Sequence, residues 1–157
     1  HVIFVQLKII TMKYLIGCTS VFFVLLLFLS CSEDKRYVSL PVFEIGLSNS
    51  EDLHVGDNVI LTLTNKNTPE NLRYDSYVWS CSPEVDGLAS ATPNSNNSFV
   101  PKQRGRHKFS VRVEVTTFAD GNAADNGKKI TVGETTNTYN VSTLKMFVTV
   151  ERTVTVK

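Results

Sequence analysis

The sequence predicts that residues 38–157 form an all-β domain, an antiparallel β-sandwich of about seven or eight strands. Three observations lead to this fold class. Apolar and polar residues alternate along several segments, no segment of this region repeats with the helical period, and pieces rich in Gly, Pro, Asn and Asp separate the alternating runs. Since alternation buries every second side chain of a strand, two sheets packed face to face would bury all of these apolar residues.

The individual strands are predicted from four alternating segments, which are residues 59–64, 77–81, 109–115 and 144–150. The clearest is 109–115 (FSVRVEV), where apolar and polar residues take strict turns. Turn-forming residues occupy the pieces between them, at 55–58, 92–97 and 119–122. Alternation then continues to Lys157, which leaves three interpretations open: one very long strand, a hairpin, or a chain that stops before a further domain.

The same alternation places five residues in the structural core: Tyr77, Trp79, Phe109, Val111 and Val113. Trp79 is expected at the centre because a buried indole contributes a large contact area, with Phe109 and Val111 as its neighbours. The alternative is an exposed Trp79 that stacks against a ligand. Its position within the apolar set of its strand favours the core.

Four segments within residues 40–150 follow the order seen in PKD domains and related bacterial Ig-like domains, namely 54–64, 74–81, 98–115 and 144–150. In those families a Val-Gly-Asp turn leads into the second strand, which matches residues 55–57. A tyrosine and a tryptophan on the third strand match Tyr77 and Trp79, and a proline and a glycine before the long strand match Pro101 and Gly105. The chain departs from the PKD pattern after Trp79, where SCSP replaces Asp-Phe-Gly-Asp-Gly. The resemblance is therefore to a PKD-like or Ig-like sandwich.

An apolar segment precedes this domain. Residues 14–30 (YLIGCTSVFFVLLLFLS) carry no charge and follow Met12 and Lys13. A membrane-spanning helix needs about 20 apolar residues, whereas a basic start followed by an apolar run and small residues is typical of a signal peptide. We therefore expect a hydrophobic signal helix at 12–30, and we interpret residues 1–11 as translated upstream sequence. If residues 1–11 belong to the protein, they lengthen the apolar segment and raise the odds of an uncleaved helix.

A cysteine stands where the apolar segment ends. Leu-Phe-Leu-Ser-Cys, ending at Cys31, resembles the lipobox of bacterial lipoproteins, with Ser30 as the small residue and Phe28 in place of the usual leucine. The resemblance implies cleavage before Cys31 and a diacylglycerol on its sulfur, so that the protein is bound to a membrane. The alternative is an incidental cysteine at the end of an apolar helix.

The residues after this cysteine carry a second resemblance. Ser32, Glu33 and Asp34 resemble the short acidic export signal of surface lipoproteins of the Bacteroidetes. This implies an outer-membrane or cell-surface location, with residues 31–37 as lipid anchor and linker. Cys18 would leave with the signal peptide, so that Cys81 remains as the one thiol of the predicted domain and no disulfide forms within it.

Charge and composition exclude several functions. Without residues 1–30 the formal charge changes from +1 to −1, which argues against a nucleic-acid partner because such proteins need a clustered basic face. The tightest basic run, 102–108 (KQRGRHK), is interpreted as a solvated turn, with an anionic partner as the alternative. His54 and His107 are isolated from other ligand-type residues, and no nucleotide or nucleophile motif occurs. We therefore expect no cofactor and no enzymatic activity.

One loop has the composition of a cation site. Asp120, Asn122 and Asp125 supply hard oxygen atoms that suit a weakly held calcium ion, but their spacing does not fit the EF-hand pattern. The same residue types are common in hairpin loops. A plain loop without metal is therefore the preferred interpretation.

Two functions agree with these observations. The first is a non-catalytic surface lipoprotein whose Ig-like domain acts as a spacer or a protein-adhesion module. The alternative is a carbohydrate-binding module of a surface glycan-uptake system, with a polysaccharide as ligand. That alternative requires exposed aromatic rings on one face, for which Tyr74, Phe118 and Tyr139 are the candidates.

Overall fold

The computed structural model describes residues 37–49, 52–118 and 120–157, which form nine β-strands and one short 3-10 helix. The strands are β1 (Phe43–Leu47), β2 (Val59–Asn65), β3 (Leu72–Ser82), β4 (Ala91–Thr92), β5 (Asn96–Phe99), β6 (Gly105–Thr117), β7 (Lys129–Val132), β8 (Thr135–Val141) and β9 (Lys145–Val156). The 3-10 helix η1 covers Ala123–Asp125. The fold of this part of the chain is all-β, as predicted.

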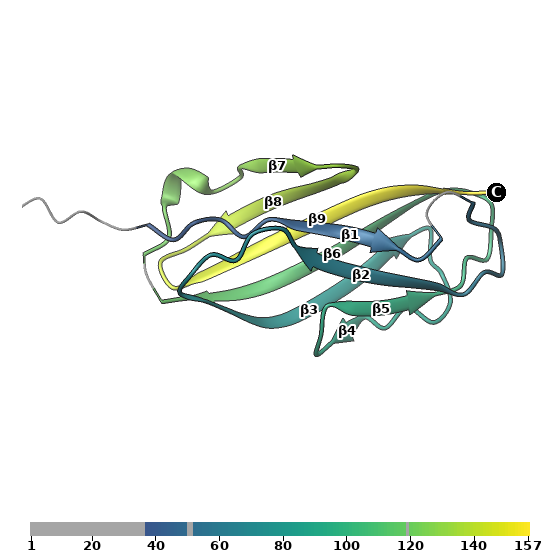
Figure 1. Ribbon diagram of the computed structural model, residues 1–157, viewed down its shortest axis with the longest axis horizontal. Coiled ribbons are helices and arrows are strands. Elements are labelled where there is room, and N and C mark those ends of the chain that lie inside the picture. Colours follow the sequence, from purple (N-terminus) through teal and green to yellow (C-terminus); the bar gives the residue numbers. More distant parts are fainter. Residues whose placement is uncertain (1–36, 50–51, 119) are drawn as a thin grey trace, which may run out of the picture. The chain divides into compact units, whose positions relative to one another are not determined.

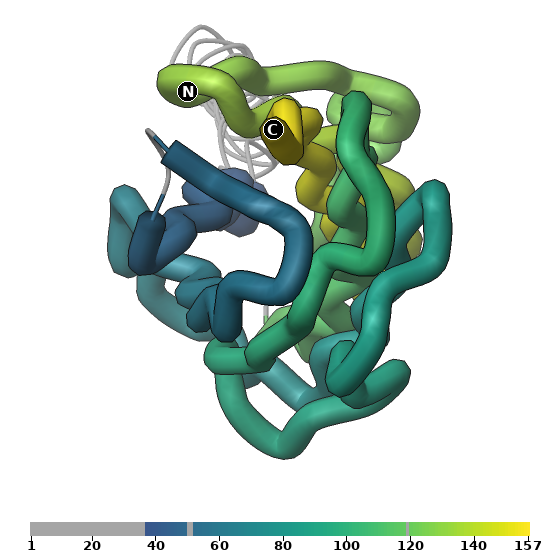
Figure 2. The backbone as a smooth tube through the Cα atoms, turned by 90° about the vertical axis from the view of Figure 1, so that its right-hand side faces the viewer, coloured from purple at the N-terminus to yellow at the C-terminus, as the bar shows by residue number. Residues whose placement is uncertain are grey.

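The strands form two antiparallel sheets (Figure 1). The small sheet has the order β1-β2-β5, and the large sheet has the order β4-β3-β6-β9-β8-β7. Seen along the strands, β1 and β2 (blue) lie on one side of the interior and β9 (yellow) on the other (Figure 2). Apolar residues of both sheets contribute to one core cluster, so the arrangement is that of a β-sandwich.

The long strand β6 shows how alternation builds this core. From His107 to Thr117 buried side chains alternate with exposed or partly exposed ones, and Phe109, Val111 and Val113 are fully buried. Trp79 pairs in register with Val111 and is 2% exposed, while Tyr77 is half-buried against the same cluster. The indole N–H of Trp79 donates a hydrogen bond to Thr92 Oγ1 at 3.0 Å, which satisfies the buried donor.

The C-terminal segment forms a single strand. β9 runs without interruption over Lys145–Val156 and pairs with β6 on one side and β8 on the other. The segment is therefore one very long strand and does not fold back as a hairpin within 145–156. A partner on each side leaves β9 without a free edge over the residues that pair with both strands.

The β7–β8 hairpin extends the large sheet and was not predicted as a pair of strands. Its longer strand, β8, reads TTNTYNV, and its inward-facing positions include the fully buried Thr135 and Asn137. Because polar residues face inward there, the apolar alternation that identifies other strands is absent from β8.

The free edge of β1 is satisfied by side chains of the opposite sheet. The N–H of Phe43 donates to Asn137 Oδ1 at 2.9 Å, and Asn137 Nδ2 donates back to the Phe43 carbonyl at 2.9 Å. One buried carboxamide thereby replaces both hydrogen bonds that a neighbouring strand would make with Phe43.

The same arrangement continues on both sides of Phe43. The N–H of Ile45 donates to Thr135 Oγ1 at 3.2 Å, and its carbonyl accepts from Arg152 at 2.6 Å. The hydroxyl of Tyr139 donates to the Pro41 carbonyl at 2.8 Å. We call Thr135, Asn137, Tyr139 and Arg152 the edge ladder, because together they pair the β1 edge and join the two sheets along one side.

Substitution of Asn137 tests the edge ladder. In Asn137→Ala both backbone groups of Phe43 lose their partner inside the protein, and we expect the free energy of unfolding to fall by about 2–4 kcal/mol. Urea denaturation followed by circular dichroism measures this change. Asn140→Ala, on the exposed side of the same strand, is the matched control and should change the value by no more than about 0.5 kcal/mol. Equal effects of the two substitutions would contradict the ladder.

Candidate functional site

A hollow lies on the outer face of the large sheet. It has a volume of about 150 Å³ and is lined by Ser76, Val78, Arg112, Glu114 and Phe147. These residues come from the adjacent strands β3, β6 and β9, and the strand register places Val78 opposite Arg112 and Glu114 opposite Phe147. We call this feature the β6 hollow, since β6 contributes its two charged residues.

Arg112 is the cation in the β6 hollow that can bind a ligand. Its guanidinium lies over the Phe147 ring, 4.1 Å from the ring centroid, which is a cation–π contact. None of the ion pairs within the described part of the chain involves Arg112. The ring therefore orients the guanidinium, whose donors remain available for a carboxylate from outside.

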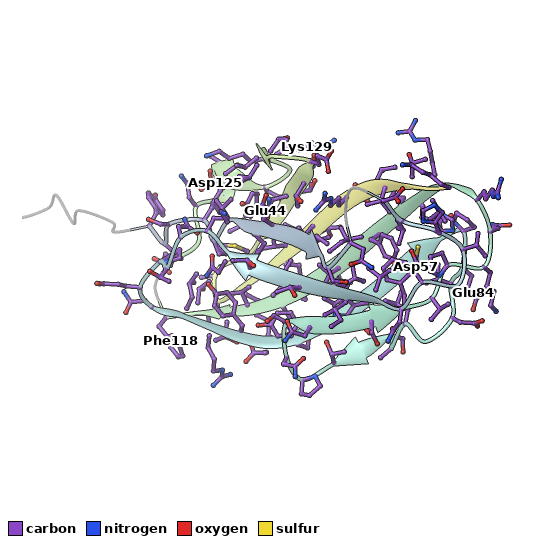
Figure 3. The ribbon with its side chains drawn as sticks, turned by 45° about the vertical axis from the view of Figure 1, so that its right-hand side comes forward. Glu44, Asp57, Glu84, Phe118, Asp125 and Lys129 are labelled. Carbon is purple, nitrogen blue, oxygen red and sulfur yellow. The ribbon has the colours of Figure 1, made fainter. Side chains whose placement is uncertain are left out.

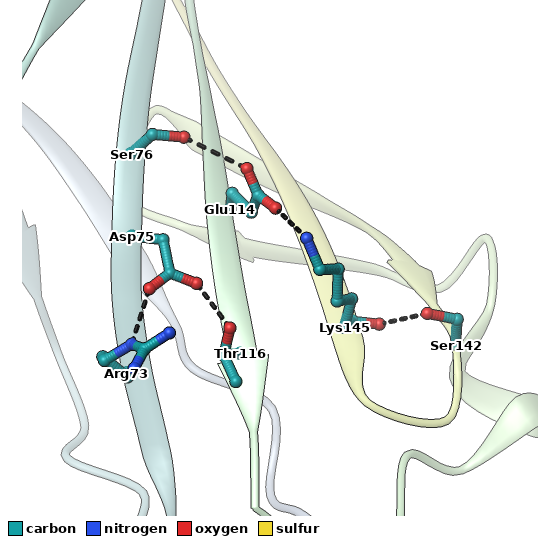
Figure 4. Close-up of polar contacts among 7 residues, drawn as sticks. All are labelled: Arg73, Asp75, Ser76, Glu114, Thr116, Ser142 and Lys145. Atoms are coloured by element: carbon teal, nitrogen blue, oxygen red, sulfur yellow. Dashed lines mark hydrogen bonds and ion pairs between the residues drawn. The ribbon is translucent and has the colours of Figure 1, made fainter.

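Glu114 is neutralised within the protein. Lys145 Nζ lies 2.6 Å from one carboxylate oxygen, and the Ser76 hydroxyl donates to the other at 3.4 Å (Figure 4). The hydrogen bond and the charge of Glu114 raise the pKa of Lys145. Because this pair is internally balanced, Arg112 gives the β6 hollow one excess positive charge.

A second polar cluster lies beside the hollow at the start of β3. Asp75 accepts a hydrogen bond from the Thr116 hydroxyl and one from Arg73 Nε at 2.7 Å (Figure 4). The Thr116 hydrogen bond, followed by that of Arg73, lowers the pKa of Asp75. A register shift between Tyr74 and Ser76 places Asp75 in a bulge, which turns its side chain outward.

A second cavity, of about 230 Å³, opens beside Trp79 and is lined mainly by Cys81, Glu84, Val85 and Leu88. Cys81 is half-buried, and its burial raises the pKa of the thiol to about 12. The sulfur is therefore protonated at neutral pH and is a poor nucleophile. The cavity therefore resembles a packing gap at the edge of the apolar core.

The predicted calcium candidates do not converge. Asn122 caps η1 by accepting from the Ala124 N–H at 3.1 Å, and Asp125 forms an ion pair with Lys128 at 3.0 Å. Asp120 contacts the start of the domain through its main chain, where its carbonyl accepts from the Val38 N–H. Among the described residues, no group of three or more His, Cys, Asp or Glu side chains is close enough to share a metal ion.

The basic run 102–108 is divided among different environments. Lys102 pairs with Asp86 at 2.6 Å, and Lys108 pairs with Glu151 at 2.7 Å. His107 lies between these two lysines in the sequence, and its side chain is fully buried. Lys102 and Lys108 are thus paired with carboxylates, whereas Arg104 and Arg106 are exposed and take part in none of the ion pairs found among the described residues.

The three aromatic candidates for sugar stacking do not share an exposed face. Tyr139 is 1% exposed and belongs to the edge ladder, so its proposed exposure is wrong. Tyr74 is half-buried, with its ring edge-on to Phe43 at 5.6 Å, because the bulge at Asp75 turns Tyr74 inward together with Tyr77. Phe118 alone of the three is well exposed.

The predicted lipidation and export residues, Cys31, Ser32, Glu33 and Asp34, lie outside the described residues, as does the predicted signal helix. Within the part that the structure describes, no helix has the length and apolar character needed to cross a bilayer.

No protein-family model matches the chain, and no curated protein and no solved structure is significantly similar to it. The functional assignment therefore depends on the residues and the geometry described above.

The reactivity of Cys81 tests the environment of the second cavity. The folded pKa of about 12 lies above the ordinary value of 9.0, so the neutral thiol stabilises the fold below pH 9, and this contribution is lost as pH rises toward 12. We expect the alkylation rate of Cys81 by iodoacetamide to keep rising between pH 8 and about 10.5 in the native protein. Mass spectrometry of the peptide that contains Cys81 measures the rate.

The urea-unfolded chain is the control for this measurement. There the thiol ionises near its ordinary pKa, and the alkylation rate should level off above about pH 9. A native rate that also levels off near pH 9 would show that Cys81 is not shielded from water.

Proposed function

We propose that the protein is a non-catalytic surface lipoprotein, anchored through Cys31, whose Ig-like domain serves as a spacer or protein-adhesion module. The observation that carries the binding part of this proposal is the β6 hollow, where Arg112 is oriented by Phe147 and is free of internal carboxylates. The anchor part is supported by the lipobox-like sequence that ends at Cys31 and by the acidic residues that follow it.

The strand order supports the Ig-like assignment. In Ig domains strands A, B and E belong to one sheet, while strands C, F and G belong to the other. β1, β2 and β5 occupy the places of the first set, and β3, β6 and β9 occupy those of the second. Trp79 on β3 has the position of the buried tryptophan of strand C. The β7–β8 hairpin then corresponds to an insertion between strands F and G.

The outer face of the large sheet suits a protein partner. Its centre combines an exposed apolar side chain, Val78, with the aromatic ring of Phe147 and the guanidinium of Arg112. Apolar, aromatic and arginine side chains that meet in one depression are typical of the energetic centre of a protein interface. The excess positive charge favours a partner that presents an Asp or Glu side chain beside an apolar group.

The described polar groups support binding and not chemical catalysis. Hydrogen bonds from the Thr116 hydroxyl and from Arg73 lower the pKa of Asp75, which opposes a role in accepting protons near neutral pH. Glu114 is engaged in its ion pair with Lys145. The thiol of Cys81 has a raised pKa. Each group is thus held in the form that serves packing or recognition.

The mature N-terminus tests the anchor. We expect mass spectrometry of the protein isolated from membranes to find a chain that begins at Cys31 and carries a diacylglycerol on sulfur. Cys31→Ser should abolish both the lipid and the cleavage, because the thioether cannot form. An uncleaved chain, or a cut end without lipid in the unmodified protein, would contradict the proposal.

A photo-crosslinking amino acid at Val78 tests the adhesion surface. Val78 is 48% exposed at the β6 hollow, and Ile60, which is 53% exposed on β2 of the other sheet, is a matched control. With the full-length lipoprotein on intact cells, we expect crosslinked protein adducts from position 78 and few from position 60. Arg112→Ala should reduce the adducts at position 78 at least several-fold. Equal crosslinking at the two positions would exclude the hollow as the adhesion surface.

A further inference from the structure

Three of the large apolar side chains that are exposed on the domain lie at one end of it. Tyr37 is 50% exposed, and Phe118 and Leu144 are each 64% exposed. We call this the Phe118 end. Figure 3 shows Phe118 at one end of the described domain and Asp57 and Glu84 at the other. Exposed apolar residues that gather in one place mark a contact surface more often than isolated ones do.

Backbone hydrogen bonds hold these three residues near one another. The N–H of Thr117 donates to the Leu144 carbonyl at 3.0 Å, which sets Phe118 beside Leu144. The N–H of Val38 donates to the Asp120 carbonyl at 3.2 Å, which brings the start of the domain to the same place. The cluster is therefore formed by the loops at the ends of β6 and β9 together with the first described residues.

The chain itself indicates what this end contacts. Cys31 precedes Tyr37 by six residues, so a fully extended connection spans no more than about 22 Å. We propose that the Phe118 end rests on the membrane in which Cys31 is anchored, with Phe118 and Leu144 inserted into the interfacial layer of the bilayer. This inference rests on the lipid anchor of the proposed function.

Because the tether is short, a weak contact between the domain and the bilayer is sufficient to orient the domain. An anchor within about 22 Å turns the contact between the domain and the bilayer into an intramolecular step, with an effective concentration in the millimolar range. Tyr37 suits the membrane interface, where an apolar ring and a polar hydroxyl are both accommodated, and Phe118 and Leu144 add apolar surface. Two or three exposed apolar side chains then suffice to orient the domain, although they would not hold an untethered one.

The charges around the Phe118 end fit a contact that does not depend on lipid charge. Lys145, next to Leu144, is paired with Glu114, and Lys128 is paired with Asp125. The contact proposed here is made by exposed apolar side chains, so that it does not require anionic lipid. The contact should therefore form on zwitterionic phosphatidylcholine.

The proposed orientation has a consequence for the spacer role. The strands run between the Phe118 end and the opposite end, as the antiparallel pairing of β6 and β9 requires (Figure 1). Thirteen residues of β6 span about 44 Å at 3.4 Å per residue. With the Phe118 end on the bilayer, the opposite end is presented to the surroundings and the β6 hollow remains accessible from the side.

Fluorescence quenching in vesicles tests this orientation. The full-length lipoprotein, in a Cys81→Ser background, carries a nitrobenzoxadiazole label on F118C or L144C and is reconstituted into phosphatidylcholine vesicles that contain a doxyl-labelled lipid. V55C is the matched control, since Val55 is an exposed apolar residue in the loop before β2 at the opposite end. We expect quenching at positions 118 and 144 to exceed that at position 55 at least twofold.

Two further measurements, the acylation state of Cys31 and the dependence of quenching on protein density, separate the possible outcomes. Mass spectrometry of the same sample shows whether Cys31 is acylated. If Cys31 is acylated and quenching is equal at both ends of the domain, the proposed orientation is excluded while the anchor stands. An unmodified Cys31 would overturn the proposed function and this inference together. If quenching appears only at high protein density, the Phe118 end contacts a second copy of the chain, which would also overturn the inference. A label on Y37C should lose quenching in the F118E/L144E variant, whose two changes lie on exposed side chains.

Discussion

The hydrogen bonds between the β1 edge and the opposite sheet are the constraint on which the sandwich depends. A two-layer β-fold has open sides, and a free strand edge exposes backbone groups that are costly to bury without partners. Here Asn137 and Thr135 supply the missing partners from β8, while Arg152 reaches the same edge from β9. The sheets are thereby joined by specific polar contacts along one side in addition to the apolar core between them.

These contacts also explain which parts of the fold the sequence predicts. β2 and β6 are predicted because valine, leucine and phenylalanine recur at every second position along both strands. β8 carries Asn137 and Thr135 at inward positions, so its pattern resembles that of an exposed loop. The buried polar residues that close the sandwich are thus the ones that conceal the strand from a hydrophobic-pattern analysis.

The candidate site could be predicted only in part. Alternation along β6 places Arg112 and Glu114 on the outer face, but their neighbours depend on the strand register, which the sequence does not specify at this distance. The bulge at Asp75 is likewise absent from any local pattern, and it turns Tyr74 inward although simple alternation from Tyr77 points it outward. The hollow therefore emerges only when three strands are placed side by side.

The β6 hollow and the Phe118 end are two separate surfaces of the domain. The β6 hollow lies on the central strands of the large sheet, so its side chains are held by paired backbone on both sides. The Phe118 end is built from loops and from the first residues of the domain, close in sequence to Cys31. The recognition and the attachment that we propose thus involve separate regions that share one core.

Amide hydrogen exchange at Phe43 and Ile45 tests the central claim most directly. If the edge ladder closes the sandwich, these two amides should exchange as slowly as that of Val113, which lies in the middle of β6, because all three are released only when the sheets separate. Exchange at Phe43 and Ile45 as fast as that of an unprotected strand edge would show that side chains do not close this side of the fold.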